Sequence, residues 1–208
     1  MNSNNIPSQD PANTNSLVGS IIFALRKWLE SVDDALPVQV LGFTPPTSTD
    51  FAYVSCRSLI QIVGTGGQLS PRETYPKIPV LMLGGGGFII YFPVKEGDIG
   101  YIKAMDRDIS LYLQSGGTAK PNINALHSFS SSIFIPQAAR NLILSEEDMG
   151  NLVLQTLDGI SKISIGDEKI TISAPSVEII GETIINMTGN LAVNGNITAT
   201  GTITPGVE

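Results

Sequence analysis

The chain has few charged residues, one cysteine and one histidine among its 208 residues. A single cysteine excludes disulfide bonds within the chain, and a single histidine excludes a metal site built from several histidines of one chain. Charged residues make up 15% of the sequence, against a typical value of about 25% for soluble domains. The formal net charge of -7 argues against a protein that binds nucleic acid by neutralising phosphates.

Aromatic residues are absent from the last third of the chain, because all 13 of them lie at or before Phe134. Charge divides near the same place. Residues 1–140 carry 10 basic and 10 acidic side chains, whereas residues 141–208 carry two basic and nine acidic ones, so the whole net charge lies in the last third. Two kinds of structure are therefore predicted in one chain.

No segment has the sequence of a membrane-spanning helix. The longest uncharged apolar stretch, Ile78 to Val94, contains four consecutive glycines, Gly84 to Gly87, whereas a spanning helix needs roughly 20 apolar residues without such breakers. We expect two strands joined by a glycine turn there. Met1 to Asn15 is polar and lacks a basic segment before an apolar run, so we expect a mobile tail and not a signal peptide.

One amphipathic helix is predicted, from Ser16 to Leu36. Its apolar residues recur at three- and four-residue spacing, with charged residues between them, as expected of a helix with one buried face. Pro37 is expected to end it. We expect the apolar face to pack on its own domain, with docking to a partner as the alternative.

From Val38 to Pro136 the pattern favours short strands. They are predicted at Val38–Val40, Phe51–Val63, Ile78–Leu83, Phe88–Phe92, Asp98–Ala104 and Ile133–Ile135. Short strands in about 100 residues with an aromatic core are typical of a small barrel or sandwich. A five-stranded barrel of the OB type is the expected fold.

The last third alternates aliphatic and polar residues with a period of two. Strands are predicted at Lys169–Ala174, Ser176–Ile179, Ile185–Thr188, Asn190–Asn194 and Asn196–Thr200, each bounded by Gly or Pro. Such narrow stripes cannot enclose a core in one chain, and their edges would stay open. Three chains wound around one axis solve both problems, with Asp158, Asp167, Glu168, Glu178 and Glu182 on the outside. The predicted fold class is all-β: a flexible N-terminus with an amphipathic helix (1–36), an OB-fold domain (37–140) and an intertwined triple-stranded β-helix of a homotrimer (141–208).

Three segments carry a family resemblance. Thr74 to Leu83, Gly84 to Gly87 and Phe88 to Gly100 closely resemble the core of phage baseplate central spike proteins of the Gp138 N-terminal-domain family, which are similar to the membrane-piercing spikes of phages P2 and Mu. Asp106–Ile109 and the segment from Asn124 to Pro136 resemble further elements of the same family.

The resemblance implies an OB-fold domain followed by a trimeric β-helix that crosses the host outer membrane when the tail sheath contracts. It implies a location at the tail baseplate tip of the virion. The implied partners are two further copies of the chain, baseplate hub and tail tube proteins and, transiently, the host outer membrane, with no nucleic acid.

Two departures from the family pattern are visible. A serine run, Ser130 to Ser132, stands where the family has an aspartate after the histidine. Many such spikes also end in a His-x-His tip that binds iron, whereas His127 is the sole histidine here. We therefore predict no cofactor, no iron tip and a blunt end from Gly201 to Glu208, capped by a separate tip protein.

Several residues could be taken for sites. Gly84 to Gly87 could cradle phosphate, but no Gly-Lys-Ser/Thr follows them, so a hairpin turn is expected. Asp106 and Asp108 could bind a cation, but they lack further oxygen ligands, so a turn salt-bridged by Arg107 is expected. His127 is expected to be structural, because no motif supplies a nucleophile for it.

The remaining candidates also receive structural interpretations. Cys56 is expected to be a buried thiol. Glu146, Glu147 and Asp148 could act as a carboxylate pair on sugars, but a solvated linker turn is preferred. No catalytic, cofactor-binding or metal-binding residue is predicted, and the chain is not expected to be an enzyme.

The sequence thus favours a mechanical role: the central spike of a contractile tail, which pierces the host outer membrane. One alternative is a non-enzymatic tail module that binds surface glycans, for which barrel aromatics such as Tyr91 or Tyr101 must be exposed. The spike of a related contractile injection system is another. A cell-wall hydrolase carried on a spike is the enzymatic alternative.

Overall fold

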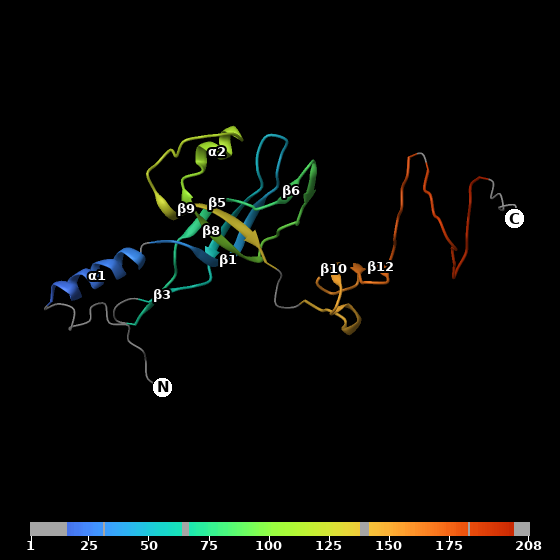
Figure 1. Ribbon diagram of the computed structural model, residues 1–208, viewed down its shortest axis with the longest axis horizontal. Coiled ribbons are helices and arrows are strands. Elements are labelled where there is room, and N and C mark those ends of the chain that lie inside the picture. Colours follow the sequence, from blue (N-terminus) through green and yellow to red (C-terminus); the bar gives the residue numbers. More distant parts are fainter. Residues whose placement is uncertain (1–15, 31, 64–66, 138–141, 183, 202–208) are drawn as a thin grey trace. The chain divides into compact units, whose positions relative to one another are not determined.

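The computed structural model describes residues 16–30, 32–63, 67–137, 142–182 and 184–201. The chain divides into two compact units, residues 1–142 and 143–208, called here the N-terminal and C-terminal units. Figure 1 shows their elements. The predicted N-terminal tail (1–15) and all of the predicted blunt end except Gly201 lie outside the described residues. Within the described part, no helix is long and apolar enough to cross a membrane.

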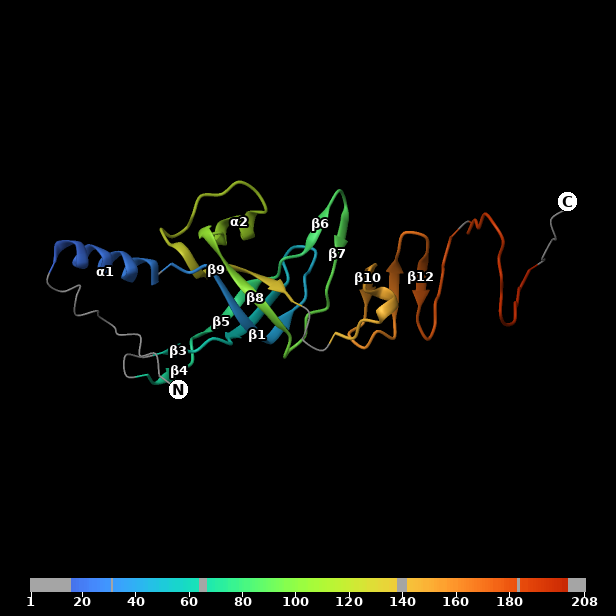
Figure 2. The ribbon, with the colours of Figure 1, turned by 60° about the horizontal axis from the view of Figure 1, so that its bottom comes forward.

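The N-terminal unit is built on one curled sheet that forms a half-barrel (Figure 2). Its strands are β1 (Ala35–Thr44), β2 (Tyr53–Ser58), β5 (Thr74–Pro79), β8 (Ile99–Arg107) and β9 (Leu126–Pro136), in the order β5-β2-β1-β8-β9. All neighbours in this order are antiparallel. The two outer strands approach each other through a parallel bridge between Val80 and Phe134, and the amide of Leu81 donates to the carbonyl of Phe134 at 2.8 Å.

Smaller elements surround this sheet. Two separate hairpins are formed by β3 (Ile62–Val63) with β4 (Leu69–Ser70), and by β6 (Leu83–Gly85) with β7 (Phe88–Ile90). A short helix, α2 (Ser110–Ser115), follows β8 and ends at Gly116 in the left-handed conformation. The mostly β character of this unit agrees with the predicted fold class.

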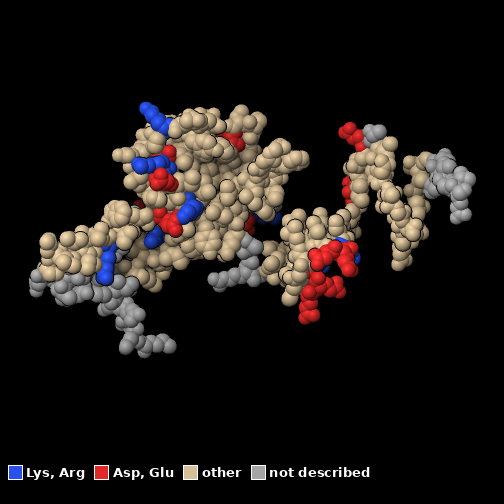
Figure 3. Space-filling model, in the orientation of Figure 1, with Lys and Arg blue, Asp and Glu red and all other residues tan. Residues whose placement is uncertain are grey.

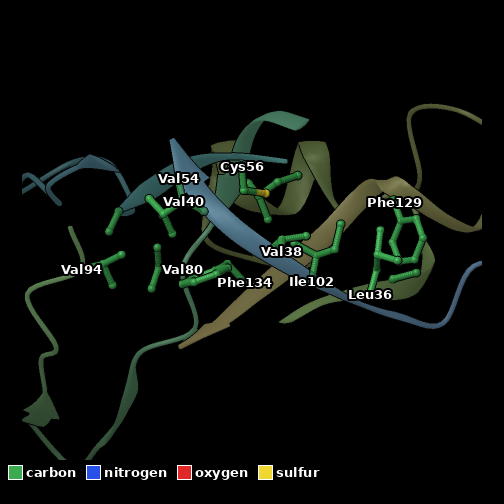
Figure 4. Close-up of a cluster of buried hydrophobic side chains, with 13 residues drawn as sticks. Leu36, Val38, Val40, Val54, Cys56, Val80, Val94, Ile102, Phe129 and Phe134 are labelled. Carbon is green, nitrogen blue, oxygen red and sulfur yellow. The ribbon is translucent and has the colours of Figure 1, made fainter. Parts of the chain in front are cut away.

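The core lies inside the curl of the sheet, as Figure 4 shows. Leu36, Val38 and Val40 alternate along β1 and are buried, as a strand with one covered face requires. Phe134 is fully buried in the same cluster. Cys56 is buried there as predicted, and burial raises the pKa of its thiol to about 11.

Gly100 makes room for the Phe134 ring. A Cβ at this position of β8 would lie 2.4 Å from two ring carbons of Phe134 and 2.5 Å from the carbonyl oxygen of Ile135. Real Cβ atoms do not come this close to a backbone atom, so only glycine fits without rearrangement. The strand predicted at Asp98–Ala104 is confirmed as β8, which covers Ile99–Arg107 and so extends further at its carboxyl end than predicted.

The predicted helix is shorter than expected. Helix α1 covers Leu17–Glu30, and Leu36 and Pro37 belong to β1. A residue before proline is disfavoured in helical geometry, and the Leu36 side chain is buried in the core. Asp33 and Asp34 precede β1 and are already held by the sheet, because the Asp33 amide donates to the His127 carbonyl and the Ala104 amide donates to the Asp34 carbonyl.

Among the described residues, the apolar face of α1 is left largely exposed by its own unit, contrary to expectation. Its large apolar side chains remain exposed in the single chain: Leu17, Val18, Ile21, Ile22, Leu25, Trp28 and Leu29. A helix of this kind normally takes its stability from a covered apolar face. The prediction that the face packs within the domain is therefore wrong for the isolated chain, and docking to a partner stays a prediction.

The C-terminal unit contains a three-stranded antiparallel sheet. Its strands are β10 (Leu152–Gln155), β11 (Lys162–Ile165) and β12 (Ile170–Ser173), preceded by a 3-10 turn, η2 (Glu146–Asp148). The strand predicted at Lys169–Ala174 is confirmed as β12, whereas β10 and β11 were not predicted. The four later predicted strands do not form in the single chain, since the described residues from 174 onward contain no strand.

Candidate functional site

The most unusual surface of the described residues is one side of the sheet β10-β11-β12. The cross-strand pairs place six aliphatic side chains on the same side, in two rows of three. We call this set the aliphatic face: Leu152, Leu154, Ile163, Ile165, Ile170 and Ile172. All six are exposed, with exposed fractions from 39% to 67%. An apolar sheet face normally packs against another layer, so this sheet presents to solvent the side that other sheets bury.

The opposite side of the same sheet is polar. Asp148 is only 4% exposed, and it accepts hydrogen bonds from the ammonium of Lys162 on β11 and from the hydroxyl of Ser145. The hydrogen bond from Lys162, followed by that from Ser145, holds the pKa of the Asp148 carboxyl well below its usual range. Beside them, Asn151 donates through Nδ2 to the Ser164 hydroxyl at 2.9 Å, and Ser164 is buried.

These contacts correct one prediction. Glu146 and Glu147 are exposed, in line with a solvated turn, but Asp148 is buried and paired. The reason is that η2 brings Asp148 close to Lys162, 14 residues later in the chain, and a buried carboxylate is retained only where it is paired and hydrogen-bonded. This arrangement uses the carboxylate to hold η2 and β11 together.

The acidic side chains of the C-terminal unit lie at its surface. Figure 3 shows red atoms in a cluster beside the sheet and again on the segment that follows it, while much of the visible surface of this unit carries no charge. The five acids predicted to coat the outside are all exposed in the chain: Asp158, Asp167, Glu168, Glu178 and Glu182. Their placement is compatible with an outer, water-facing surface.

The glycine tetrad forms a hairpin turn, as predicted. Gly84 and Gly85 pair with Ile89 and Phe88, so Gly86 and Gly87 alone form the loop. Their φ angles are +60° and +87°, and two successive positive φ angles are what a two-residue type I′ hairpin requires.

The loop after β8 is organised by Asp108. Its carboxylate accepts hydrogen bonds from the amides of Ser110, Asn122 and Ile123 and from the Ser110 hydroxyl, at 3.0–3.2 Å. The Ser110 amide contributes most to lowering the pKa of Asp108. Nε of Arg107 instead lies 3.6 Å from Oδ2 of Asp106. The prediction of a salt-bridged turn is therefore right for Asp106 and wrong for Asp108, which is satisfied by backbone donors.

His127 and the serine run have structural contacts. Nε2 of His127 lies 3.4 Å from Oδ1 of Asp106, and both side chains are largely exposed. Ser131 accepts a hydrogen bond from the Ile109 amide at 3.0 Å, and Ser132 donates to the Phe129 carbonyl at 2.9 Å. The serines thus stabilise the start of α2 and a bend in β9. The described residues contain no group of three or more His, Cys, Asp or Glu side chains placed to hold a metal ion.

A cavity of about 340 Å³, lined by both polar and apolar side chains, includes Asp108 and is open to solvent. It is lined in part by Asp50, Lys77 and Ser130. Asp50 accepts a hydrogen bond from the Tyr53 hydroxyl at 2.9 Å, and the Lys77 ammonium lies 4.2 Å from the centre of the Tyr53 ring. These groups are engaged with one another, and the cavity lining includes no histidine or cysteine.

A comparison with protein-family models gives one match. Residues 36–137 match the phage protein Gp138 N-terminal domain. The N-terminal unit of the chain therefore contains a domain of this phage protein family. The Gp138 N-terminal domain begins at Leu36 in β1 and ends one residue after β9, so it coincides with the half-barrel sheet. The family makes the chain a phage tail- or baseplate-related, virion-associated protein. A search of curated proteins gave no match.

The aliphatic face lies outside the Gp138 N-terminal domain. Its part on β12 was predicted from the sequence as an uncovered aliphatic stripe, whereas its parts on β10 and β11 were not. Ile163 and Ile165 alternate with Lys162 and Ser164, which is a period-two signal, but the strand is only four residues long. Within the domain, the motif from Thr74 to Gly100 spans β5, both strands of the glycine hairpin and the start of β8. Tyr91 and Tyr101, which the glycan-binding alternative requires to be accessible, are both exposed.

Proposed function

We propose that the chain is the central spike of a contractile-tail baseplate, a homotrimer that mechanically pierces the host outer membrane. The Gp138 N-terminal domain supports a role in the tail. The observation that carries the proposal is the aliphatic face of the C-terminal unit. A single chain leaves this apolar side of the sheet uncovered, so further chains are needed to bury it. Several chains packed together through this face would form the stiff shaft that a piercing device needs.

The physical argument for three copies starts from this face. Six exposed aliphatic side chains in a sheet of 12 residues are costly in water, at about 25 cal/mol for each Å² of apolar surface. Around a common axis, each copy covers the faces of the other two, and the outer edges of β10 and β12 find strands to pair with. The absence of aromatic residues after Phe134 fits a thin axial core that has room for aliphatic side chains only.

We further propose that the half-barrel is an OB-type barrel. Its five strands and the parallel bridge between Val80 and Phe134 support a small, nearly closed antiparallel barrel, as in that fold. In this proposal the barrel is attached to the baseplate hub and tail tube proteins, and a separate tip protein caps the far end of the spike. The acidic outer surface, with a formal charge of 3 × -7 = -21 for the trimer, limits adhesion to anionic lipids.

Molecular mass in solution tests the proposal. Light scattering and native mass spectrometry of the full-length chain are expected to give three times 22.1 kDa, about 66 kDa, and the trimer is expected to resist heat and detergent. A folded monomer of 22.1 kDa at micromolar concentration would refute it. Metal analysis of the same sample is expected to find no stoichiometric iron.

The exposure of Tyr91 and Tyr101 keeps surface-glycan binding as a second candidate function. Exposed aromatic rings offer apolar faces against which sugars stack, and binding to a glycan array distinguishes this candidate from a purely mechanical spike. We also propose that the chain is not an enzyme. A turbidity assay on peptidoglycan is expected to show no clearing, and clearing would favour the hydrolase alternative.

A further inference from the structure

The glycine hairpin β6–β7 is an unsupported element of the N-terminal unit. Figure 2 shows it projecting from the half-barrel, and it forms a sheet of its two strands alone. Its side chains are exposed on both arms, with Phe88 at 83%. An isolated two-stranded hairpin is marginally stable in water, and the flexible glycines add to the cost of ordering it. The hairpin therefore needs a further surface to stabilise it.

The hairpin carries a large apolar surface without charge. No charged residue occurs between Lys77 and Lys95, and Figure 3 shows the projecting hairpin free of charged side chains. Seven large apolar side chains along this segment are exposed: Leu81, Leu83, Phe88, Ile89, Ile90, Tyr91 and Phe92. At 150–250 Å² for a fully exposed large side chain, their exposed fractions amount to roughly 700 Å². This area covers both sides of the hairpin, because Phe88 and Ile90 lie on one side of β7 and Ile89 on the other. The sum is close to the about 800 Å² that one partner buries in a stable interface.

The foot of the hairpin is attached to the strand that leads out of the N-terminal unit. Val80 forms the parallel bridge with Phe134, and the Leu81 amide donates to the Phe134 carbonyl. Phe134 lies two residues before the end of β9, after which the chain continues toward the C-terminal unit. In a trimer, the three chains come together after this strand, so the hairpin begins beside the start of the shared part.

We propose that hairpin β6–β7 packs against a second copy of this chain and forms an inter-chain contact separate from the aliphatic face. This inference rests on the proposed trimer. The area and the lack of charge match an apolar protein interface, and the position of the foot at the end of β9 makes a neighbouring copy the available partner. Packing on a neighbour also explains why the segment keeps aromatic residues that the last third of the chain lacks.

A lipid bilayer suits the hairpin less well than a protein surface does. Among the described residues, β6 and β7 pair only with each other, so each strand has an outer edge with unpaired backbone groups. Each such group costs several kcal/mol in hydrocarbon, where no water is present to satisfy it. The charged residues that bracket this segment, Lys77 and Lys95 against Glu96 and Asp98, cancel and give no net attraction to anionic headgroups.

Site-specific photo-crosslinking tests the proposal on the full-length protein. Phe88 is replaced by the photoreactive amino acid p-benzoylphenylalanine, which keeps the aromatic ring. The matched control carries the same amino acid at Tyr112, an exposed aromatic position on α2. After irradiation, we expect covalent dimers and trimers from position 88 and at least a tenfold lower yield from position 112.

The outcomes separate this proposal from the trimer itself. If light scattering shows a trimer but position 88 gives no more inter-chain product than position 112, the inter-chain contact is refuted and the trimer stands. Crosslinking to lipid in vesicles of phosphatidylethanolamine and phosphatidylglycerol, without inter-chain product, overturns the contact in favour of membrane insertion. A monomer by light scattering removes both proposals.

Discussion

Substituting Ile172 by Ala tests whether the aliphatic face is buried between chains. Ile172 lies opposite Ile163 in the sheet and is 57% exposed in the single chain. Full burial of an isoleucine side chain stabilises by about 1.5–3 kcal/mol, so burying the exposed part contributes about 1 kcal/mol for each chain. Most of that hydrocarbon is lost in Ile172→Ala.

Threefold symmetry multiplies the effect. Three substitutions in one trimer remove about 3 kcal/mol, which raises the trimer dissociation constant about 150-fold, since 1.4 kcal/mol corresponds to a factor of 10. A residual cavity would increase the loss. If the face stayed in solvent, the substitution would change stability by no more than about 0.5 kcal/mol.

The assay is urea-induced dissociation followed by light scattering, with Thr171→Ala as the matched control. Thr171 is the neighbouring residue on β12, and it pairs with Ser164 on the polar side of the sheet. We expect a clearly lower urea midpoint for Ile172→Ala than for Thr171→Ala. Equal midpoints for the two variants would refute the assignment of the aliphatic face as the inter-chain surface.

Three further predictions concern the interior of the two units. Gly100→Ala places a Cβ 2.4 Å from the Phe134 ring, so we expect overpacking to lower the free energy of unfolding by about 1–3 kcal/mol. Thermal and urea unfolding measure this loss. In the control Gly117→Ala the added Cβ meets open space, so its free energy of unfolding should stay within about 0.5 kcal/mol of the parent. The pKa of Asp148 is lower in the folded chain than its ordinary value, so its contribution to stability is complete above a pH of about 3.9 and declines as the pH falls below it. Between about pH 6 and about pH 2, the urea midpoint should therefore fall less steeply for Asp148→Asn than for the parent, and an unchanged slope would contradict the pairing. Burial raises the pKa of the Cys56 thiol to about 11, so a disulfide reagent at neutral pH should leave it unmodified in the folded protein and modify it fully in urea; rapid reaction of the folded protein would show that the core opens.

Some elements of the half-barrel unit could be predicted because their signals are local, whereas the strand predicted at Ile78–Leu83 was misplaced: β5 covers Thr74–Pro79 and β6 begins at Leu83. Gly84 to Gly87 lie between two apolar runs, and glycine readily adopts the positive φ angles of a two-residue hairpin turn, so this segment predicts a hairpin. The alternation around Ile102 predicts a strand. The boundary of α1 could not be predicted as well, because it depends on a distant contact. Asp33 is held by β9 through the His127 carbonyl and the Phe129 amide, which donates to its carboxylate. A contact over more than 90 residues leaves no periodic signal at the helix end.

The polar side of the C-terminal sheet was missed for a related reason. Acidic residues in a row predict a solvated turn by composition, and that holds for Glu146 and Glu147. Asp148 differs only in that the chain folds back to place Lys162 beside it. No property of the sequence around Asp148 distinguishes it from its two neighbours, so its burial can be known only from the fold.

The strands that fail to form after Ser173 follow from the physics of strand pairing. The residues from 176 to 200 have the alternation of strands, and their large aliphatic side chains, including Ile179, Leu191 and Ile197, are exposed in the single chain. A strand exists only when a neighbour pairs with its backbone groups, and periodicity reports which face is apolar without saying which chain supplies the neighbour. In β10 to β12 the backbone groups pair within one chain, but the aliphatic face stays exposed. In the described residues after Ser173, the predicted strands are not paired and the aliphatic side chains are not buried. In the proposed trimer, an identical chain alongside supplies both the missing strand partner and the missing apolar cover.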